Sequence, residues 1–310
     1  TKRPEKAVVA INEASKESDN NQNENKTDTK TPTIVKLLHA ETGEVEELEM
    51  DKYLYGVVSA EMPADFDNKA LETQAIVART YTTYQAMNNG SKHENADICD
   101  DYACCQAWIS KEDRFAKWNE NEAESNWQKI VECVDDTTGK IILYDEKPIN
   151  AFFHSNSGGI TETSLNIWGG IDYPYLKSVE TSGEDGYNQY SSEVVLSKEE
   201  LINKMKEKYS DFEIDFNTEK CIKILELTSS NRVKTIKIGN KEIAGTEARS
   251  IFGLKSTNFT FEINGENIKF SVKGYGHGVG MSQTGADSMA KTGANYEEII
   301  KHFYTDVEIK

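Results

Sequence analysis

The sequence predicts a mixed α+β fold in which antiparallel sheets and helices enclose a substrate groove. Short runs of alternating apolar and polar residues, separated by turn residues, are typical of antiparallel strands. Longer segments with apolar residues three and four positions apart predict helices between those strands. The chain has 310 residues, of which 37% are hydrophobic. This is enough apolar material for a real core.

Residues 1–31 differ in composition from the rest of the chain. They are mostly Asn, Lys, Glu, Ser and Thr, and they cannot bury enough surface to offset the entropy lost on folding. Because the chain begins at Thr1 rather than Met, we expect that an anchor, a signal peptide or a tag has been removed upstream. We therefore predict a disordered tether over 1–31, following a removed membrane anchor, and one globular domain over 32–310.

The charge of the chain excludes some classes of partner. There are 35 Lys and Arg against 53 Asp and Glu, which gives a net charge of −18. Nucleic acid and anionic membrane surfaces are disfavoured as partners, because both are bound through clustered Lys and Arg. No window reaches the roughly eighteen uninterrupted apolar residues of a membrane span.

The globular part is expected to begin with a hairpin and two helices. Two short strands surround a turn at Thr42-Gly43. Asp51 is expected to cap a helix over 53–58, which ends before a proline. Apolar residues three and four apart predict a longer helix over 68–87.

An acidic excursion is expected over residues 93–136, which contain twelve Asp and Glu against four Lys and Arg. We expect irregular structure there, with some helix over 111–133. A hairpin over 140–155 then leads to Gly158 and Gly159, and this pair allows close backbone approach to a ligand.

The last third of the chain carries clear local signals. A Ser-x-x-Glu capping box predicts a helix over 198–209. The strongest turn signal is Asn264-Gly265, which is expected to join two strands in a hairpin. A glycine-rich segment over 274–280 then leads into two helices that are separated at Gly293.

Glu61 is the first candidate for chemistry. It lies between the two N-terminal helices, so its carboxylate is expected to project from a corner rather than from a smooth helical face. Apolar residues precede it and Met-Pro follows it, and such surroundings disfavour the charged form of a carboxyl and suit a general acid. A solvated surface glutamate is the plainer alternative, but position and environment both favour a catalytic role.

A second candidate is a group of His and Cys residues that lie within thirteen positions of one another. Thiolate and imidazole are the ligands that zinc prefers. We predict zinc bound by His93, Cys99 and Cys105, with Cys104 as a substitute. Fewer than four protein ligands would leave a position for water or substrate. A disulfide from Cys99 to Cys104 or Cys105, and unligated thiols, are the alternatives.

Other catalytic motifs are disfavoured. The glycine-rich segment 274–280 lacks the GxxxxGK[ST] pattern, so it does not predict a nucleotide site. A flat glycine surface beside His277, Ser282 and Gln283 suits the polar face of a sugar chain, and a tight bend is the alternative explanation. No GxSxG elbow for a serine nucleophile is present.

Three blocks of the sequence resemble one known family. Together they resemble stage II sporulation protein D, a family of lytic transglycosylases that act in engulfment in spore-forming bacteria. AEMP with ARTY, combined with the GHGVGMSQ run, makes the resemblance specific, and the blocks span the whole globular part. The three blocks are YLYGVVSAEMPADFDNKALETQAIVARTY, FFHSNSGGITETSLNIWGGIDYPYLKSVE and GYGHGVGMSQTGADSMAKTGANYEEIIKHFY.

The resemblance implies cleavage of peptidoglycan glycan strands between N-acetylmuramic acid and N-acetylglucosamine, after an amidase has removed the stem peptides. The family's catalytic acid/base falls on Glu61, and a functional arginine falls on Arg79, for which a helix-bracing salt bridge is the alternative. The His and Cys cluster is similar to a zinc site in the clostridial branch. The candidates for the glycan groove are His154, Ser155, Ser157, Tyr175, Lys177, His277 and Gln283.

The resemblance also implies a cellular setting. The partners would be stage II sporulation proteins P, an amidase, and M. The location would be the extracytoplasmic face of the mother-cell septal or engulfing membrane, with an N-terminal anchor helix that is absent from this chain. A groove for glycan on so acidic a protein should be locally neutral or basic, and Arg79 and Lys177 are the expected sources of positive charge.

Two rival functions remain open on sequence alone. One is an amidase enhancer that binds glycan without cutting it, which would not need an acid at Glu61. The other is a zinc-dependent hydrolase, against which stand the thiolate-rich ligand set and the lack of an HExxH-type helix.

Overall fold

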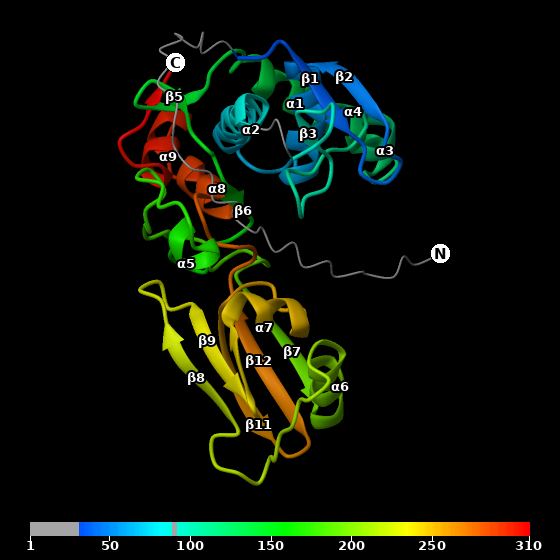
Figure 1. Ribbon diagram of the computed structural model, residues 1–310. Helices are drawn as coiled ribbons and strands as arrows, with labels where there is room; N and C mark the ends of the chain where they lie inside the picture. The colour runs from blue at the N-terminus through cyan, green and yellow to red at the C-terminus, as the bar shows by residue number, and fades with distance from the viewer. Residues whose placement is uncertain (1–30, 89–91) are drawn as a thin grey trace, which may run out of the picture. The chain divides into compact units, whose positions relative to one another are not determined.

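The computed structural model describes residues 31–88 and 92–310, which form two compact units (Figure 1). The helical unit comprises residues 31–88, 92–153 and 286–310, and the sheet unit comprises residues 154–285. The globular part predicted as one domain over 32–310 is thus two units, with the second inserted into the first. The predicted tether over 1–31 lies outside the described residues except for its last position.

The α+β prediction is confirmed, because helices and small, mainly antiparallel sheets occur in both units. In the helical unit, the sheet β2-β1-β3 has β1 antiparallel to β2 and parallel to β3, and the sheet β14-β4-β5 is antiparallel. The strands of this unit are β1 (Ile34–Leu38), β2 (Val45–Glu49), β3 (Ile98–Cys99), β4 (Ile142–Tyr144), β5 (Lys147–Pro148) and β14 (Glu308–Ile309). Its helices are α1 (Met50–Glu61), α2 (Asn68–Asn88), α3 (Lys111–Phe115), α4 (Glu120–Asp135) and α9 (Tyr296–Phe303).

Helix α2 is the centre of the helical unit and packs against α1, α4 and α9 (Figure 1). It matches the predicted helix, but every residue from Ala70 to Thr83 is buried. A helix enclosed on all sides has no polar face. Its buried threonines satisfy their hydroxyls by donating to the carbonyl four residues back, as Thr80 and Thr82 do.

Helix α1 is longer than predicted at both ends. Its N-cap is Glu49, which makes no side-chain cap hydrogen bond. The predicted cap, Asp51, instead binds Arg79 and Thr138, so the capping prediction is wrong. The helix ends at Glu61 because the next residue, Met62, is extended and precedes a proline. Glu61 is therefore at a corner of the chain, as expected.

The acidic excursion is more regular than predicted. Strand β3 joins it to the first sheet, and the helix expected over 111–133 is divided into α3 and α4. The hydroxyl of Ser110 caps α3 by accepting a hydrogen bond from the backbone of Asp113. One face of α4, including Trp127 and Ile130, is buried in the unit.

The sheet unit contains two antiparallel three-stranded sheets, β10-β9-β8 and β11-β12-β7, and an apolar core in which Phe252 stacks on Phe270 with ring centroids 5.1 Å apart. The predicted hairpin is present, with Gly265 and Glu266 as its two-residue loop, and so is the capping box of α6. The elements of this unit are α5 (Ser164–Trp168), β7 (Ser191–Ser197), α6 (Lys198–Lys208), β8 (Ile222–Leu227), β9 (Val233–Ile238), β10 (Lys241–Ala244), α7 (Gly245–Phe252), β11 (Asn258–Asn264), β12 (Asn267–Lys273) and β13 (Met281–Ser282).

The chain passes between the units at β6 (Phe153–His154) and within α8 (Gln283–Lys291). Helices α8 and α9 are separated at Gly293, as predicted, with a backbone φ of 102° at the glycine. Within the described residues, no helix is long and apolar enough to cross a membrane.

Candidate active site and metal centre

The carboxylate of Glu61, the last residue of α1, is held by the backbone of a neighbouring segment. The N–H of Ala107 donates to Oε1 of Glu61 at 2.7 Å. The side chain is half-buried. A carboxyl group fixed in this way at a corner has a defined orientation, which a general acid requires.

The segment that carries Ala107 is fastened to α1 and α2. The amide nitrogen of Gln106 donates to the hydroxyls of Tyr53 and Thr82, both at 2.9 Å. Trp108, which follows Ala107, packs directly on Gly56. A Cβ added to Gly56 would come within 2.2 Å of the indole nitrogen of Trp108. Only glycine allows this approach. The position of the Ala107 N–H is therefore set by contacts on both sides.

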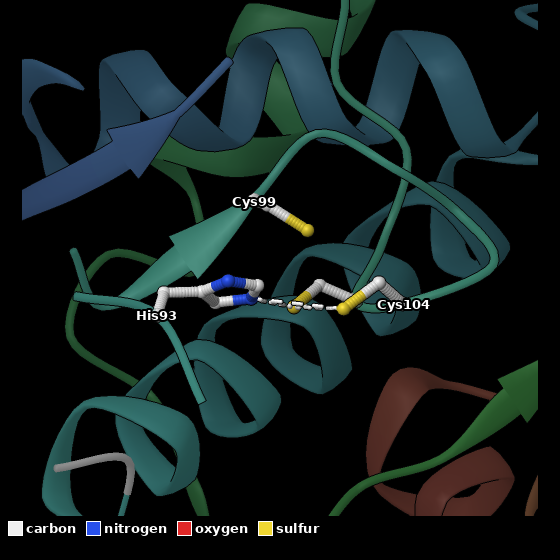
Figure 2. A group of neighbouring side chains, drawn as sticks. His93, Cys99 and Cys104 are labelled. Carbon is white, nitrogen blue, oxygen red and sulfur yellow. Dashed lines mark hydrogen bonds between the residues drawn. The ribbon is translucent and has the colours of Figure 1, made fainter. Parts of the chain in front are cut away.

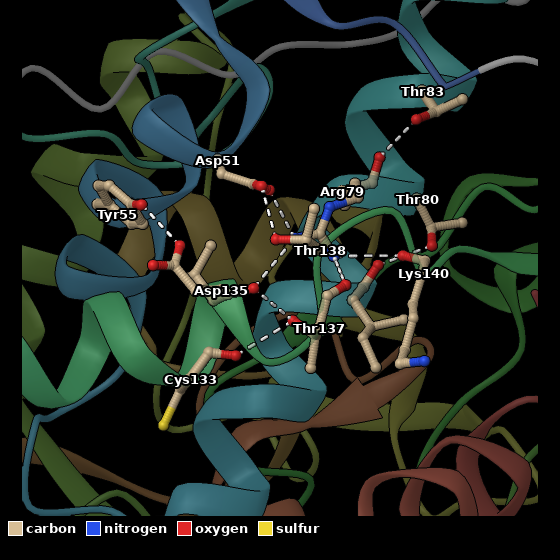
Figure 3. A network of polar contacts seen from close by, with 12 residues as sticks. Asp51, Tyr55, Arg79, Thr80, Thr83, Cys133, Asp135, Thr137, Thr138 and Lys140 are labelled. Atoms are coloured by element: carbon tan, nitrogen blue, oxygen red, sulfur yellow. Dashed lines mark hydrogen bonds and ion pairs between the residues drawn. The ribbon is translucent and has the colours of Figure 1, made fainter.

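Arg79 is fully buried at the junction of α1, α2 and α4 (Figure 3). Its guanidinium binds Asp51 Oδ1 at 2.9 Å and donates to the carbonyl of Thr137 at 2.8 Å. It also lies 3.3 Å from the carbonyl of Lys140. Carbonyls that follow a helix end lack intrahelical donors, and a cation there stabilises them.

This geometry leaves no exposed surface on Arg79 with which to contact a glycan. The expectation that it supplies positive charge to a groove is therefore wrong, because its charge faces Asp51 and the carbonyls after α4. The contacts of Arg79 are those of the alternative, a salt bridge that braces the helices. Arg79 connects the start of α1, which ends at Glu61, to the end of α4.

The three predicted metal ligands and their named substitute, Cys104, converge in the helical unit (Figure 2). Their ligand atoms all lie within 4.8 Å of one another. The imidazole Nε2 of His93 is 3.3 Å from the sulfur of Cys105 and 3.7 Å from that of Cys104, and these two sulfurs are 4.0 Å apart. The sequence analysis named Cys104 only as a substitute, but the structure brings Cys99, Cys104 and Cys105 to His93 together.

The donor set and its spacing fit a tetrahedral zinc ion. Bonds of about 2.3 Å to sulfur and about 2.0 Å to nitrogen place tetrahedral ligand atoms about 3.5–3.8 Å apart, close to the distances in this cluster. Hydrogen bonds from the other two thiols, those of Cys105 and Cys99, lower the pKa of Cys104. Hydrogen bonds to Cys104 raise the pKa values of Cys99 and Cys105.

All five cysteines are free thiols in the structure. The alternative of a disulfide from Cys99 to Cys104 or Cys105 is therefore not what the structure contains. Four protein ligands would close a tetrahedral site and leave no position for water, which is the pattern of structural rather than catalytic zinc. The cluster is also adjacent to the candidate acid, because Cys105 is two residues before Ala107.

An open pocket of about 400 Å³ lies in the helical unit near this segment. It is lined by Trp108 and by acidic side chains that include Glu44, Glu46 and Asp100. Glu61 is not among its lining residues, so this pocket is not evidence for a substrate site.

In the sheet unit, the buried carboxylate of Glu184 organises the first candidate loop. It accepts hydrogen bonds from the backbone N–H groups of Ser157 and Gly159, both at 3.0 Å, and from the hydroxyls of Ser157, Ser282 and Thr284. The hydroxyl of Ser157 is therefore used internally. Sequence analysis missed Glu184, because nothing in its neighbourhood distinguishes it from the adjacent Asp185.

The two candidate histidines of this unit, His154 and His277, are in opposite tautomers. Hydrogen bonds to the backbone of Val279 determine both tautomers. His154 Nδ1 lies 3.1 Å from the carbonyl of Val279, so this nitrogen carries the proton. The N–H of Val279 donates to Nδ1 of His277 at 3.0 Å, so His277 carries its proton on Nε2. Burial, followed by His277 and Arg232, lowers the pKa of His154 well below its ordinary value, and its imidazole is neutral.

Internal packing requires glycine at two positions of segment 274–280, Gly276 and Gly278. A Cβ on Gly276 would come within 2.8 Å of His154, and one on Gly278 within 2.4 Å of the buried Arg232. Both glycines also have positive φ angles. Close packing within the protein therefore explains these two glycines. Neither a sugar-binding surface nor a simple bend is needed to explain them. Gly159, by contrast, has open space where its Cβ would be.

The remaining candidates of the glycan groove differ in exposure. Tyr175 and Gln283 are buried, and Ser155 is half-buried. Lys177 is exposed and remains available as a source of positive charge. These four residues lie in the sheet unit, whereas Glu61 lies in the helical unit.

Comparison with known proteins identifies the class to which this fold and these residues belong. A family model described as "Stage II sporulation protein" matches residues 39–144, the segment that contains Glu61, Arg79 and the His and Cys cluster. The chain is thus related to sporulation proteins.

Individual relatives give the family. The chain is 34% identical over 280 residues to stage II sporulation protein D of Bacillus amyloliquefaciens, covering 90% of this chain and 79% of the relative. It is 32% identical, with the same coverage, to stage II sporulation protein D of Bacillus subtilis. The amidase enhancer of Bacillus subtilis is 27% identical over 81% of this chain and 39% of that protein. The chain belongs to the stage II sporulation protein D family, and the resemblance drawn from the sequence is confirmed.

Proposed function

We propose that this protein is a lytic transglycosylase that cleaves peptide-stripped peptidoglycan between N-acetylmuramic acid and N-acetylglucosamine, with Glu61 as the single general acid/base. The observation that carries the proposal is the fixed carboxylate of Glu61 at the end of α1, held by the Ala107 N–H at 2.7 Å. Membership of a family of sporulation proteins supports a cell-wall substrate.

The proposed chemistry needs only one carboxylate from the protein. Ordinary glycosidases use two, one as acid and one as base or nucleophile. Here Glu61 first donates its proton to the glycosidic oxygen as the bond to the muramic C1 breaks. It then removes the proton from the muramic C6 hydroxyl, whose oxygen closes on C1 to form the 1,6-anhydro ring. The acid ends the cycle protonated, and no water is consumed.

Arg79 and Ser157 support this chemistry by positioning. Arg79 binds Asp51 at the start of α1 and the carbonyls after α4, so it holds the helix that ends at Glu61. Ser157, through Glu184, holds the loop that presents Gly159. Among the other groove candidates, Ser155, Lys177 and His277 are accessible enough for direct glycan contact. His154, Tyr175 and Gln283 are buried and would support the groove from behind.

We further propose that His93, Cys99, Cys104 and Cys105 hold a structural zinc ion. When bound, the ion supplies a fixed crosslink and neutralises the thiolates. The chain's own contribution is to hold the segment of Gln106 and Ala107 against α1, so that the Ala107 N–H meets Glu61. This closed ligand set argues against the zinc-dependent hydrolase.

Membership of the family supports a cellular setting for this activity. We propose that the protein acts during engulfment, at the extracytoplasmic face of the septal or engulfing membrane, with stage II sporulation proteins P and M as partners. An N-terminal anchor helix would precede the residues of this chain.

A second candidate function is a non-catalytic enhancer of a cell-wall amidase, favoured by the 27% identity to the amidase enhancer of Bacillus subtilis. Mass spectrometry of the products from peptide-free glycan strands separates the two functions. We expect 1,6-anhydro ends from the wild type. Intact strands would support the enhancer, and reducing ends would indicate hydrolysis.

The variant Glu61→Gln tests the assignment of the acid. It keeps the shape of the side chain but has no acidic proton to transfer, and general acid–base catalysis contributes about 10²–10⁴-fold. We expect anhydro product to fall by at least that factor at unchanged unfolding temperature. Glu47→Gln, on exposed β2 of the same unit, is the matched control and should cut normally. Unchanged turnover in Glu61→Gln would remove Glu61 from the mechanism.

A further inference from the structure

The sheet unit presents an exposed apolar group that none of the proposed roles uses. Leu165 and Trp168 on α5 are each 46% exposed, and Ile171, which follows the helix, is 65% exposed. We call these three residues the Trp168 platform. Exposed apolar side chains this close together in the chain, with a large aromatic ring among them, are typical of ligand-binding surfaces.

The platform rests on a buried support. Oε1 of Glu162 accepts hydrogen bonds from the N–H of Thr163 at 2.7 Å and from the side-chain amide of Asn166 at 2.9 Å. Its other oxygen accepts from the hydroxyl of Ser230. Glu162 itself is fully buried. Because the carboxylate fixes the start of α5, Trp168 is held in place before any ligand arrives, which lowers the entropic cost of binding.

The platform adjoins a polar group of known orientation. The ring of Trp168 is 5.1 Å from that of His277, centroid to centroid, and His277 is 5.7 Å from His154. The backbone N–H of Val279 fixes the tautomer of His277, so its proton is on Nε2. An apolar ring face and an oriented N–H donor thus lie next to each other.

Bare backbone completes the surface. Gly169 and Gly170 follow Trp168 directly, both with positive φ angles, and neither would meet any atom within 4 Å if it carried a Cβ. A rigid ring can therefore approach the edge of the platform without meeting side chains at these positions.

This combination fits a pyranose ring better than a purely apolar partner. A sugar ring has an apolar face of C–H bonds and an edge of hydroxyl groups, and an N-acetyl group adds one methyl. The C–H face suits an aromatic ring, and the hydroxyl edge suits an imidazole donor. We propose that Trp168 stacks on one N-acetylhexosamine ring of the glycan strand and forms a binding subsite. The inference rests on the proposed function for the identity of the ligand.

The test measures glycan binding separately from cleavage. Each substitution is made in the Glu61→Gln protein, and titration calorimetry with peptide-free glycan strands gives the Kd. We expect Trp168→Ala and Trp168→Leu to raise the Kd by about tenfold, whereas Trp168→Phe, which keeps an aromatic ring, should stay within about threefold. Leu227→Ala removes an apolar side chain of similar exposure from β8 of the same unit and should leave the Kd unchanged.

The outcomes distinguish this inference from the proposed function. If Trp168→Ala binds glycan as tightly as its Glu61→Gln parent, the subsite is excluded, and a protein partner becomes the better occupant of the platform. If Trp168→Leu binds as well as the Phe variant, apolar contact without stacking explains the site, and the inference is wrong. If binding depends on Trp168 but the wild type releases no anhydro product, the subsite stands and transglycosylation fails. Thermal unfolding confirms that each variant is folded.

Discussion

Two polar regions of this protein are built from opposite kinds of atoms. Around Glu184, in the sheet unit, N–H and O–H groups converge on one buried carboxylate and satisfy it from within the chain. In the cluster of His93, Cys99, Cys104 and Cys105, in the helical unit, four atoms that all offer electron pairs converge on one another.

This difference indicates which of the two regions would bind a ligand from solution. A carboxylate surrounded by donors is complete, and adding a cation there would gain little. Four potential metal ligands lie within 4.8 Å of one another, and a zinc ion is the group that such a set would accept from outside. The first arrangement is therefore satisfied from within the protein, whereas the second has the ligand set of the zinc site proposed above.

The largest effect is expected on the cluster. Cys99→Ser removes one of its four ligands, so the zinc content should fall from about one ion per chain toward zero. Loss of the ion should cost about 3 kcal/mol of unfolding free energy, or about 6–12 °C in the unfolding temperature. Plasma mass spectrometry of protein purified without added zinc measures the metal.

Cys221→Ser is the matched control, because it also removes a buried thiol but lies in the other unit. It should keep the metal. A wild-type protein without zinc, or a Cys99→Ser protein that retains it, would overturn the contrast between the two regions.

The second effect concerns the Glu184 network. Glu184→Gln keeps the shape, but its NH₂ group must face donors that previously met a carboxylate oxygen. Buried donors left unsatisfied cost about 1–3 kcal/mol. Urea denaturation measures the loss, and the exposed Glu193→Gln should change stability by less than about 0.5 kcal/mol. Equal stability of the two variants would mean that the network is not a support.

The third effect is a pH dependence that arises from His154. Burial lowers its pKa well below the ordinary value, which in the unfolded chain is about 6.5. Below that pH the unfolded state takes up a proton that the folded state does not. The free energy of unfolding should therefore fall as the pH drops, by up to about 1.4 kcal/mol per pH unit, and should not change through this group above pH ~6.5.

Urea denaturation at pH values of about 7, 6 and 5 measures this slope. His154→Asn retains a donor for the carbonyl of Val279 but cannot be protonated, so its stability should fall less steeply. Identical slopes for the variant and the wild type would show that His154 is not the group responsible.

The smallest effect is expected from removing a single donor of Glu184. Ser282→Ala leaves the donors from Ser157, Gly159 and Thr284 in place, so the cost should be about 1 kcal/mol. In the Glu184→Gln background, Ser282→Ala should lower the free energy of unfolding by clearly less, because the hydrogen bond between these two side chains is already altered. Additive costs in this double-mutant cycle would show that Ser282 acts independently of Glu184.

The sequence predicted the local features of the fold well. The corner at Glu61, the helix α2, the capping box of α6 and the hairpin at Gly265 are all present. Each depends on residues a few positions apart, such as a proline two residues after Glu61, and such interactions are visible in a single sequence.

Features that depend on distant residues were missed or misassigned. Asp51 was expected to cap α1, but it pairs with Arg79, twenty-eight residues away. Glu184 gave no local signal, although its donors come from segments that are up to a hundred residues distant. The glycines of segment 274–280 looked like a ligand surface or a bend, and their packing against His154 and Arg232 is not visible in the sequence.

The sequence by itself determined the α+β class, the candidate acid Glu61 and the residue types of the His and Cys cluster, and its three blocks showed the resemblance to the family. Spacing, capping and ligand chemistry carry that information locally. Only the tertiary structure decided that Arg79 is buried, that Cys104 and Cys105 both join the cluster, that Ala107 holds Glu61 and that Glu184 supports the loop of Ser157. These facts arise from packing between segments far apart in the chain, where burial and hydrogen-bond satisfaction determine which polar groups meet.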